Sequence, residues 1–121
     1  MLRLVLILIC TASAAAAQDG MRKADVRLTQ TDLTDYLSGQ VLEFYNDSLA
    51  TYRADGGYAY RYSPDGPPIP GTYRVMGDSR VCTSFANGFS RCDYIVQNGA
   101  RHVMIIENGD RYPIRSRVAV P

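Results

Sequence analysis

Three runs of alternating apolar and polar residues, separated by two turn signals, constrain the fold of this chain more than any other feature. The runs cover residues 72–76, 80–85 and 91–97, and the breaks fall at Gly77-Asp78 and at Ala86-Asn87-Gly88. A period of two is typical of β-strands that bury one face. Asn-Gly favours a tight hairpin because it takes positive φ at low steric cost. The stretch therefore predicts consecutive antiparallel strands.

The same pattern continues on both sides of this stretch. Residues 40–45, 48–53 and 58–63 precede it as three expected strands, and residues 102–107 and 111–115 follow it after two further Asn-Gly turns. Tight turns force antiparallel neighbours, so about eight short strands predict a mainly β, up-and-down meander. Such a twisted sheet is expected to curl into a small barrel or half-barrel, with a two-sheet sandwich as the alternative.

Two segments differ from the expected strands. Four prolines among residues 64–70 predict a stiff loop rather than a strand interior, because proline donates no backbone hydrogen bond. One short N-terminal helix is expected over residues 31–37, capped by Thr29 or Thr31 and stopped at Gly39. At about two turns it must pack on other elements, and it is expected to cover an open end or an edge of the sheet.

The first 17 residues have the pattern of a signal peptide. Arg3 precedes an aliphatic run over residues 4–9, and Ala15-Ala16-Ala17 matches the small residues that a signal peptidase reads. Ile9 before Cys10 argues against a lipid-anchored cysteine, so no membrane anchor is expected after cleavage. We predict a periplasmic or secreted protein with a flexible arm over residues 18–28 and a single domain over residues 29–121.

Two cysteines, Cys82 and Cys92, remain after the predicted cleavage, and they lie on the two arms of the Asn87-Gly88 hairpin. An even number of cysteines in an oxidising compartment predicts a structural disulfide. A redox-active or metal-binding pair is the alternative, although the spacing is not Cys-x-x-Cys and His102 is the only histidine.

Charge and composition narrow the classes of function. The chain has a formal net charge of +1, and removal of Arg3 with the leader makes it formally neutral. No basic surplus is present for nucleic acid or anionic membranes, so neither partner is expected. His102 at a turn is interpreted as a solvated surface residue, and Glu43 and Glu107 do not form a recognisable catalytic pair. We therefore predict no catalytic residues, no metal site and no cofactor.

The nine tyrosines, in a chain without tryptophan, include a row on one face of a strand. Tyr58, Tyr60 and Tyr62 project the same way, and Tyr73 is expected to join them from a neighbouring strand. These residues either fill the core or line a concavity for a small apolar or sugar-like ligand. In the second case the candidate site also includes arginines near the mouth, which are Arg61 and Arg74.

The residues Gly71-Thr72-Tyr73-Arg74-Val75, followed by Cys82 and Cys92, resemble a family of small secreted proteobacterial proteins of lipocalin-like or half-barrel form. In that family a helix ending in glycine precedes strands, Asp-Gly, Gly-Thr-Trp-x-Val and two cysteines; Tyr73 stands here in place of tryptophan. The likeness covers about residues 28–114. Many members have no assigned activity, so the resemblance implies a fold and a compartment rather than a reaction.

These observations together favour a non-enzymatic exported binding or interaction module. Its partner is expected to be a small molecule inside the barrel or a periplasmic protein that contacts the loops. The alternatives are an envelope hydrolase with a carboxylate or Tyr/Arg site, and a structural protein of the envelope. A barrel interior filled by side chains, rather than a cavity of about 300 Å³ or more, would exclude the small-ligand version.

Overall fold

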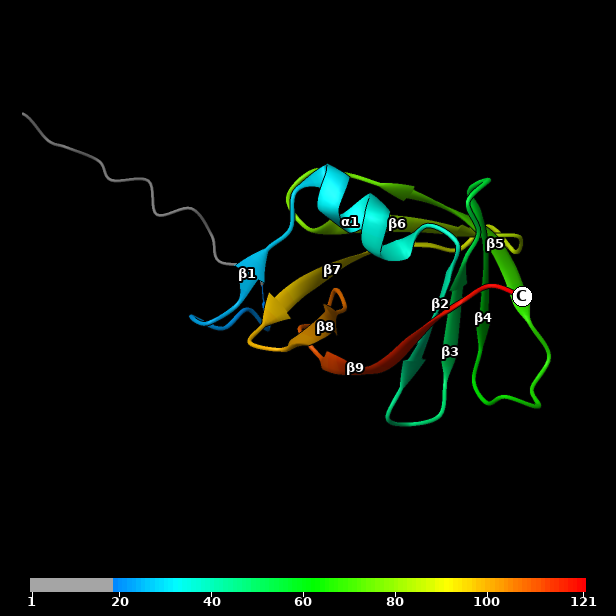
Figure 1. The fold of residues 1–121 in the computed structure, drawn as a ribbon. Helices are drawn as coiled ribbons and strands as arrows, with labels where there is room; N and C mark the ends of the chain where they lie inside the picture. Colours follow the sequence, from blue (N-terminus) through cyan, green and yellow to red (C-terminus); the bar gives the residue numbers. More distant parts are fainter. Residues whose placement is uncertain (1–18) are drawn as a thin grey trace, which may run out of the picture.

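The computed structural model describes residues 19–121, which form one helix and nine strands (Figure 1). The predicted signal peptide and the interpretation of Cys10 lie outside the described residues. In chain order the elements are β1 Val26–Arg27, α1 Gln30–Leu37, β2 Gln40–Phe44, β3 Leu49–Tyr52, β4 Gly57–Arg61, β5 Ile69–Val75, β6 Arg80–Phe85, β7 Ser90–Asn98, β8 Arg101–Ile105 and β9 Arg111–Ala119.

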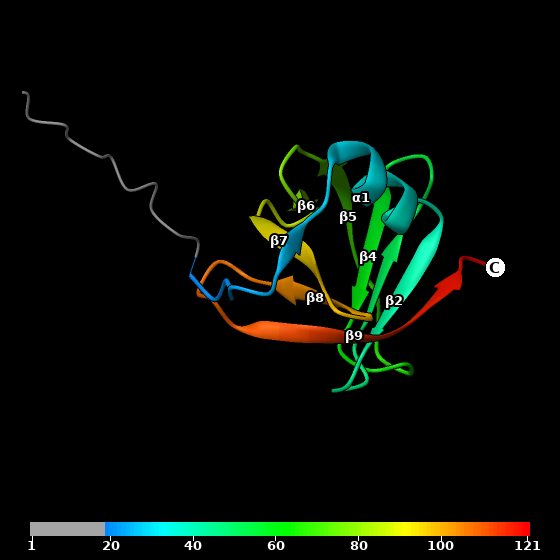
Figure 2. The same cartoon turned by 60° about the vertical axis from the view of Figure 1, so that its left-hand side comes forward.

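Strands β2 to β9 form a closed antiparallel barrel in which each strand pairs with its neighbour in the chain. The closing pair joins the first and last of them: Leu42 of β2 lies opposite Arg117 of β9. Figure 2 shows β9 sweeping from β8 to β2 and completing the circuit. The predicted mainly β, up-and-down barrel is confirmed, and its closure leaves no open edge between β2 and β9.

Strands β5 and β9 extend three residues or more beyond their predicted bounds. β5 begins at Ile69, so Pro70 lies inside a strand, contrary to the prediction of a loop through residue 70. Pro70 pairs with Ala59, and its carbonyl accepts a hydrogen bond from the backbone N–H of Ala86 at 3.1 Å. A proline near the start of a strand lacks only the donor, so the ladder tolerates it. β9 runs on to Ala119 because its last residues pair with β2.

Helix α1 covers one end of the barrel, as Figure 2 shows. Thr29 caps it, its Oγ1 accepting from the N–H of Asp32 at 3.1 Å, and Gly39 follows with a φ of 72°. Leu33 and Leu37 are fully buried in the barrel core. The helix is N-terminal to the barrel strands, although the short strand β1 precedes it.

The segment before the helix is not the loose arm that its polar sequence predicts. β1 pairs with β7, with Val26 opposite Gln97, and Met21 packs on a small apolar cluster outside the barrel. Asp25 is buried and holds Arg111 of β9 through two hydrogen bonds, of 2.6 and 2.9 Å. A bidentate ion pair of this kind fixes the segment in one geometry.

The predicted disulfide is confirmed. Cys82 of β6 and Cys92 of β7 are bonded, and they stand directly opposite each other in the register of the two strands. The bridge lies on the hairpin that carries Asn87-Gly88, where Gly88 has the positive φ, 89°, that the sequence predicts for this turn. A disulfide is compatible with an extracellular location, because oxidising compartments are where such bonds persist.

Candidate ligand-binding cavity

The barrel is filled at the helix end but hollow at the other. A cavity of about 400 Å³ opens among the loops that join β2 to β3, β4 to β5 and β6 to β7. Because neighbouring strands are antiparallel, these loops lie at the end opposite the start of β2 and the helix that leads into it. The walls of the cavity are mostly aromatic and aliphatic: Phe44, Tyr60, Tyr62, Ile69, Phe85, Phe89, Met104, Ile106 and Tyr112.

The predicted row of tyrosines runs from the core to the rim of this cavity. Tyr58 is buried and packs on Tyr52 in the core, with ring centroids 5.1 Å apart. Tyr60 and Tyr62 line the cavity, and Tyr62 is 74% exposed at the rim. Tyr73 lies towards the helix end, where its hydroxyl donates to the carbonyl of Arg53 at 2.7 Å. Tyr60 and Tyr62 therefore lie at the cavity, whereas Tyr58 and Tyr73 do not line it.

The two arginines that the sequence suggested for the mouth do not line the cavity. Arg61 directly follows Tyr60 on β4, and Arg74 directly follows Tyr73 on β5, so both project from the outer face. Arg61 instead donates from Nη1 to the carbonyl of Gly66 at 2.6 Å, within the loop that follows its own strand. Neither arginine therefore belongs to the cavity wall, although Arg61 lies beside the β4–β5 loop at the mouth.

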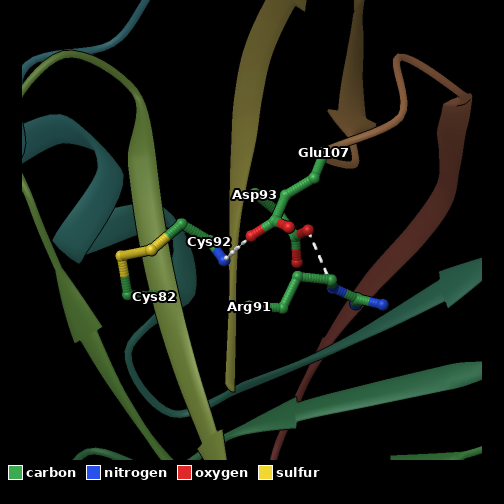
Figure 3. Close-up of a disulfide and its surroundings, with 5 residues drawn as sticks. All are labelled: Cys82, Arg91, Cys92, Asp93 and Glu107. Carbon is green, nitrogen blue, oxygen red and sulfur yellow. Dashed lines mark hydrogen bonds and ion pairs between the residues drawn. A yellow bond between two sulfur atoms is a disulfide. The ribbon is translucent and has the colours of Figure 1, made fainter. Parts of the chain in front are cut away.

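A different arginine, Arg91 of β7, lines the cavity, and sequence reasoning missed it. Its Nε lies 2.9 Å from Oδ1 of Asp93, two residues further along the same inward face (Figure 3). The side chain of Asp93 is only 2% exposed, and within residues 19–121 neither of these two atoms has a well-aligned hydrogen bond. The period of two, counted back from the core residue Ile95, is the signal that places both side chains inside.

The carboxyl of Asp93 has a raised pKa. Its burial raises the pKa of the carboxyl to about 6, outweighing the opposing effect of Arg91, and the nearby Glu107 raises it further. Glu107 reaches this site from the turn after β8, where its Oε1 accepts from the backbone N–H of Cys92 at 3.0 Å (Figure 3). Burial also raises the pKa values of Tyr52 and Tyr58, so both neighbouring phenols stay neutral.

Replacement of Asp93 tests this pKa. A carboxyl whose pKa is raised in the folded state binds a proton more tightly there, so its contribution to stability is lost as pH rises from about 4 to about 6. We expect Asp93→Asn to remove this decrease in stability with rising pH, because asparagine does not titrate. The free energy of unfolding of the native protein, relative to the variant, should fall by about 2 kcal/mol between pH 4 and pH 7. Urea titrations at both pH values measure it, and a pH-independent difference would contradict the raised pKa.

His102 is not the solvated surface residue that its turn position predicts. Its ring is half-buried and stacks on the ring of Tyr36 of α1, with centroids 4.0 Å apart. The guanidinium of Arg117 also lies over the Tyr36 ring, 4.8 Å from its centroid. Burial, followed by the charge of Arg117, lowers the pKa of His102. This packing joins the helix to β8 and β9 and lies away from the cavity.

The structure describes residues 19–121 of the chain. His, Cys, Asp and Glu side chains there form no group of three or more that could hold a metal ion. No helix in that part of the chain is long and apolar enough to cross a membrane.

The fold and the site define a class of protein: a small, disulfide-bonded, eight-stranded antiparallel barrel with an apolar cavity at one end, compatible with a lipocalin-like barrel. Comparisons with models of protein families, with curated proteins and with solved structures found no match.

Proposed function

We propose that this protein is a non-enzymatic, exported binding module that holds a small, largely apolar ligand in the open end of its barrel. The observation that carries the proposal is the cavity of about 400 Å³, with aromatic and aliphatic walls. Its volume falls within the range of sites that enclose small organic molecules, about 300 to 1,000 Å³. Export to the periplasm is supported by the leader pattern in the sequence and by the disulfide.

The rim of the cavity suits a ligand that enters from solution. Tyr62 and Phe89 are 74% and 58% exposed, on the β4–β5 loop and the β6–β7 hairpin. Phe85 lies beneath Phe89, with ring centroids 5.9 Å apart, so a continuous aromatic path leads inward. Exposed aromatic side chains around an apolar opening offer contact area to a ligand at a low cost in conformational entropy.

The hydrolase alternative gains less support from the geometry. Its strongest carboxylate would be Asp93, because a raised pKa suits a general acid. That side chain is 2% exposed and does not line the cavity, so a bound substrate would not reach its proton. A general acid must come within hydrogen-bond reach of the reacting group.

Filling the cavity tests the binding function. The neutral fluorescent probe N-phenylnaphthylamine should bind the native protein saturably, with one probe per barrel. Ile69→Trp adds bulk inside the cavity, because Ile69 lines it, and should weaken binding about tenfold or more. Thr72→Trp is the matched control, since Thr72 lies on the same strand, is exposed and faces outward. Equal loss in both variants, or no saturable binding to the native protein, would refute the proposal.

A further inference from the structure

We infer that the cavity selects an amphiphile with one anionic group, such as a carboxylate, a sulfonate or a phosphate, that contacts the free terminal nitrogens of Arg91. The apolar body of that ligand would lie between the aromatic walls. The inference rests on the proposed binding function and adds the chemical class of the ligand.

Arg91 has hydrogen-bond donors that its contact with Asp93 does not use. A guanidinium carries five N–H donors and no acceptor. The ion pair with Asp93 is made through Nε, at 2.9 Å, so Nη1 and Nη2 are the donors that remain for a ligand. The side chain is 28% exposed and lines the cavity, so its terminal nitrogens are accessible from within. Figure 3 shows the guanidinium extending past Asp93, with its terminal nitrogens on the side away from that carboxylate.

The surroundings make these donors selective for an anion. Three further polar side chains that line the cavity, the amides of Asn46 and Asn87 and the hydroxyl of Ser48, are uncharged. Ser48 and Asn46 bond to each other, because the Oγ of Ser48 donates to Oδ1 of Asn46 at 2.6 Å. Among residues 19–121, Arg91 is therefore the single charged residue that lines the cavity. An arginine held among apolar walls favours a bidentate anionic partner.

Asp93 competes with the ligand for this guanidinium. A ligand anion and Asp93 share one cation, so neutralising Asp93 should strengthen ligand binding. Four groups face Asp93: Arg91 of its own strand, Tyr52 of β3, Tyr58 of β4 and Glu107 of the β8–β9 turn. Both tyrosines are neutral in the pH range of interest, because burial raises their pKa values. The affinity of Arg91 for the ligand anion should therefore rise as Asp93 takes up a proton.

Two probes that differ by one anionic group test the inference. Anilinonaphthalenesulfonate carries a sulfonate, whereas N-phenylnaphthylamine has the same aromatic frame without it. The cleanest comparison is between Asp93→Asn and the double variant Arg91→Gln/Asp93→Asn, because neither leaves an unpaired carboxylate in the interior. The guanidinium alone distinguishes them. Arg74→Gln is the charge-matched control, since Arg74 is exposed on the outer face of β5.

We expect the double variant to bind the sulfonate probe about tenfold or more weakly than Asp93→Asn, since a charge-assisted hydrogen bond is worth at least that factor. The neutral probe should bind both variants equally, which also shows that the double variant is folded. Arg74→Gln should bind both probes like the native protein. Equal binding of the sulfonate probe to the two variants, with the neutral probe still bound, would overturn the inference and leave the proposed function intact. Failure of the native protein to bind the neutral probe would overturn both.

A measurement on the native protein needs no variant. The sulfonate stays ionised throughout, so its pH dependence reports the protein. Between about pH 7.5 and pH 5 the sulfonate probe should bind several-fold more tightly, while the neutral probe should not change. Parallel curves for the two probes would contradict the inference.

Discussion

Replacing Arg111 with methionine is expected to destabilise the protein by about 3 to 5 kcal/mol at neutral pH, the cost of leaving one partner of a buried ion pair without its counter-charge. The side chains of Asp25 and Arg111 are 1% and 12% exposed, so water does little to compensate either of them. Arg111 also donates from Nη1 to the carbonyl of Gly20 at 2.8 Å, so it ties the chain before β1 to the barrel at two points.

The pH dependence of this effect has a definite sign. Arg111, together with Asn98 and the backbone of Arg22, stabilises the charged carboxylate and holds the pKa of Asp25 well below its ordinary value of 3.8. Its contribution to stability is complete above the unfolded pKa and is lost as pH falls below about 4. The difference between the native protein and Arg111→Met should therefore shrink in acid.

Urea unfolding of three variants measures the effect. Arg115→Met is the matched control, because Arg115 also pairs with two carboxylates, Glu43 and Asp47, but does so at the surface. Exposed pairs contribute little, so this control should unfold almost like the native protein. Adding Asp25→Asn to Arg111→Met should recover part of the loss, because no buried charge then remains unpaired. Equal effects of Arg111→Met and Arg115→Met would show that the N-terminal segment does not support the barrel.

Removal of the disulfide is the second large effect. The double variant Cys82→Ser/Cys92→Ser should lose about 3 kcal/mol of unfolding free energy, the loop entropy of a bridge that closes a short hairpin. The position of the bridge adds a functional consequence. The register of β7 with β8 begins at Tyr94, so the part of β7 that carries Arg91 is held mainly by β6 and by the contact of Cys92 with Glu107.

Three measurements check this account of the bridge. Thiol titration of the native mature protein should find no free thiol, and Cys82→Ser alone should expose one, at Cys92. The double variant should also bind the sulfonate probe more weakly than the native protein, because the strand with Arg91 is less constrained. Two free thiols in the native protein, or an unchanged free energy of unfolding after the double replacement, would be incompatible with a structural disulfide.

The order and pairing of the strands could be predicted from the sequence because the signals are local. Alternation over residues 80–85 and the turn at Asn87-Gly88 define one hairpin, and repetition of such units defines a meander. The closing pair of β2 and β9 is different. It joins residues more than seventy positions apart, such as Leu42 and Arg117, and no local sequence pattern predicts a contact at that separation. The sequence accordingly left a half-barrel and a sandwich open.

Local alternation also predicted part of the cavity wall, because it shows which side chains of one strand share a face. Tyr60 and Tyr62 were selected as aromatic residues of one face, and they line the cavity. Arg61 and Arg74 are close to the tyrosines in sequence, but the period of two places each of them on the face opposite its neighbouring tyrosine. The sequence does not predict Arg91 and Asp93 as inward-facing residues, because charged residues in a strand are typical of a face exposed to solvent. Only the core packing of Ile95, on the same parity, shows that they point inward.

The central claim is that the open end of the barrel is a ligand site while the helix end is a packed core. The most direct test is to follow the backbone and methyl NMR resonances of the native protein during titration with N-phenylnaphthylamine. The account predicts saturable shifts that are largest at residues of the cavity wall, such as Tyr60, Phe85 and Met104, and small at Leu33 and His102 near α1. The absence of saturable shifts, or shifts centred on the helix, would contradict it.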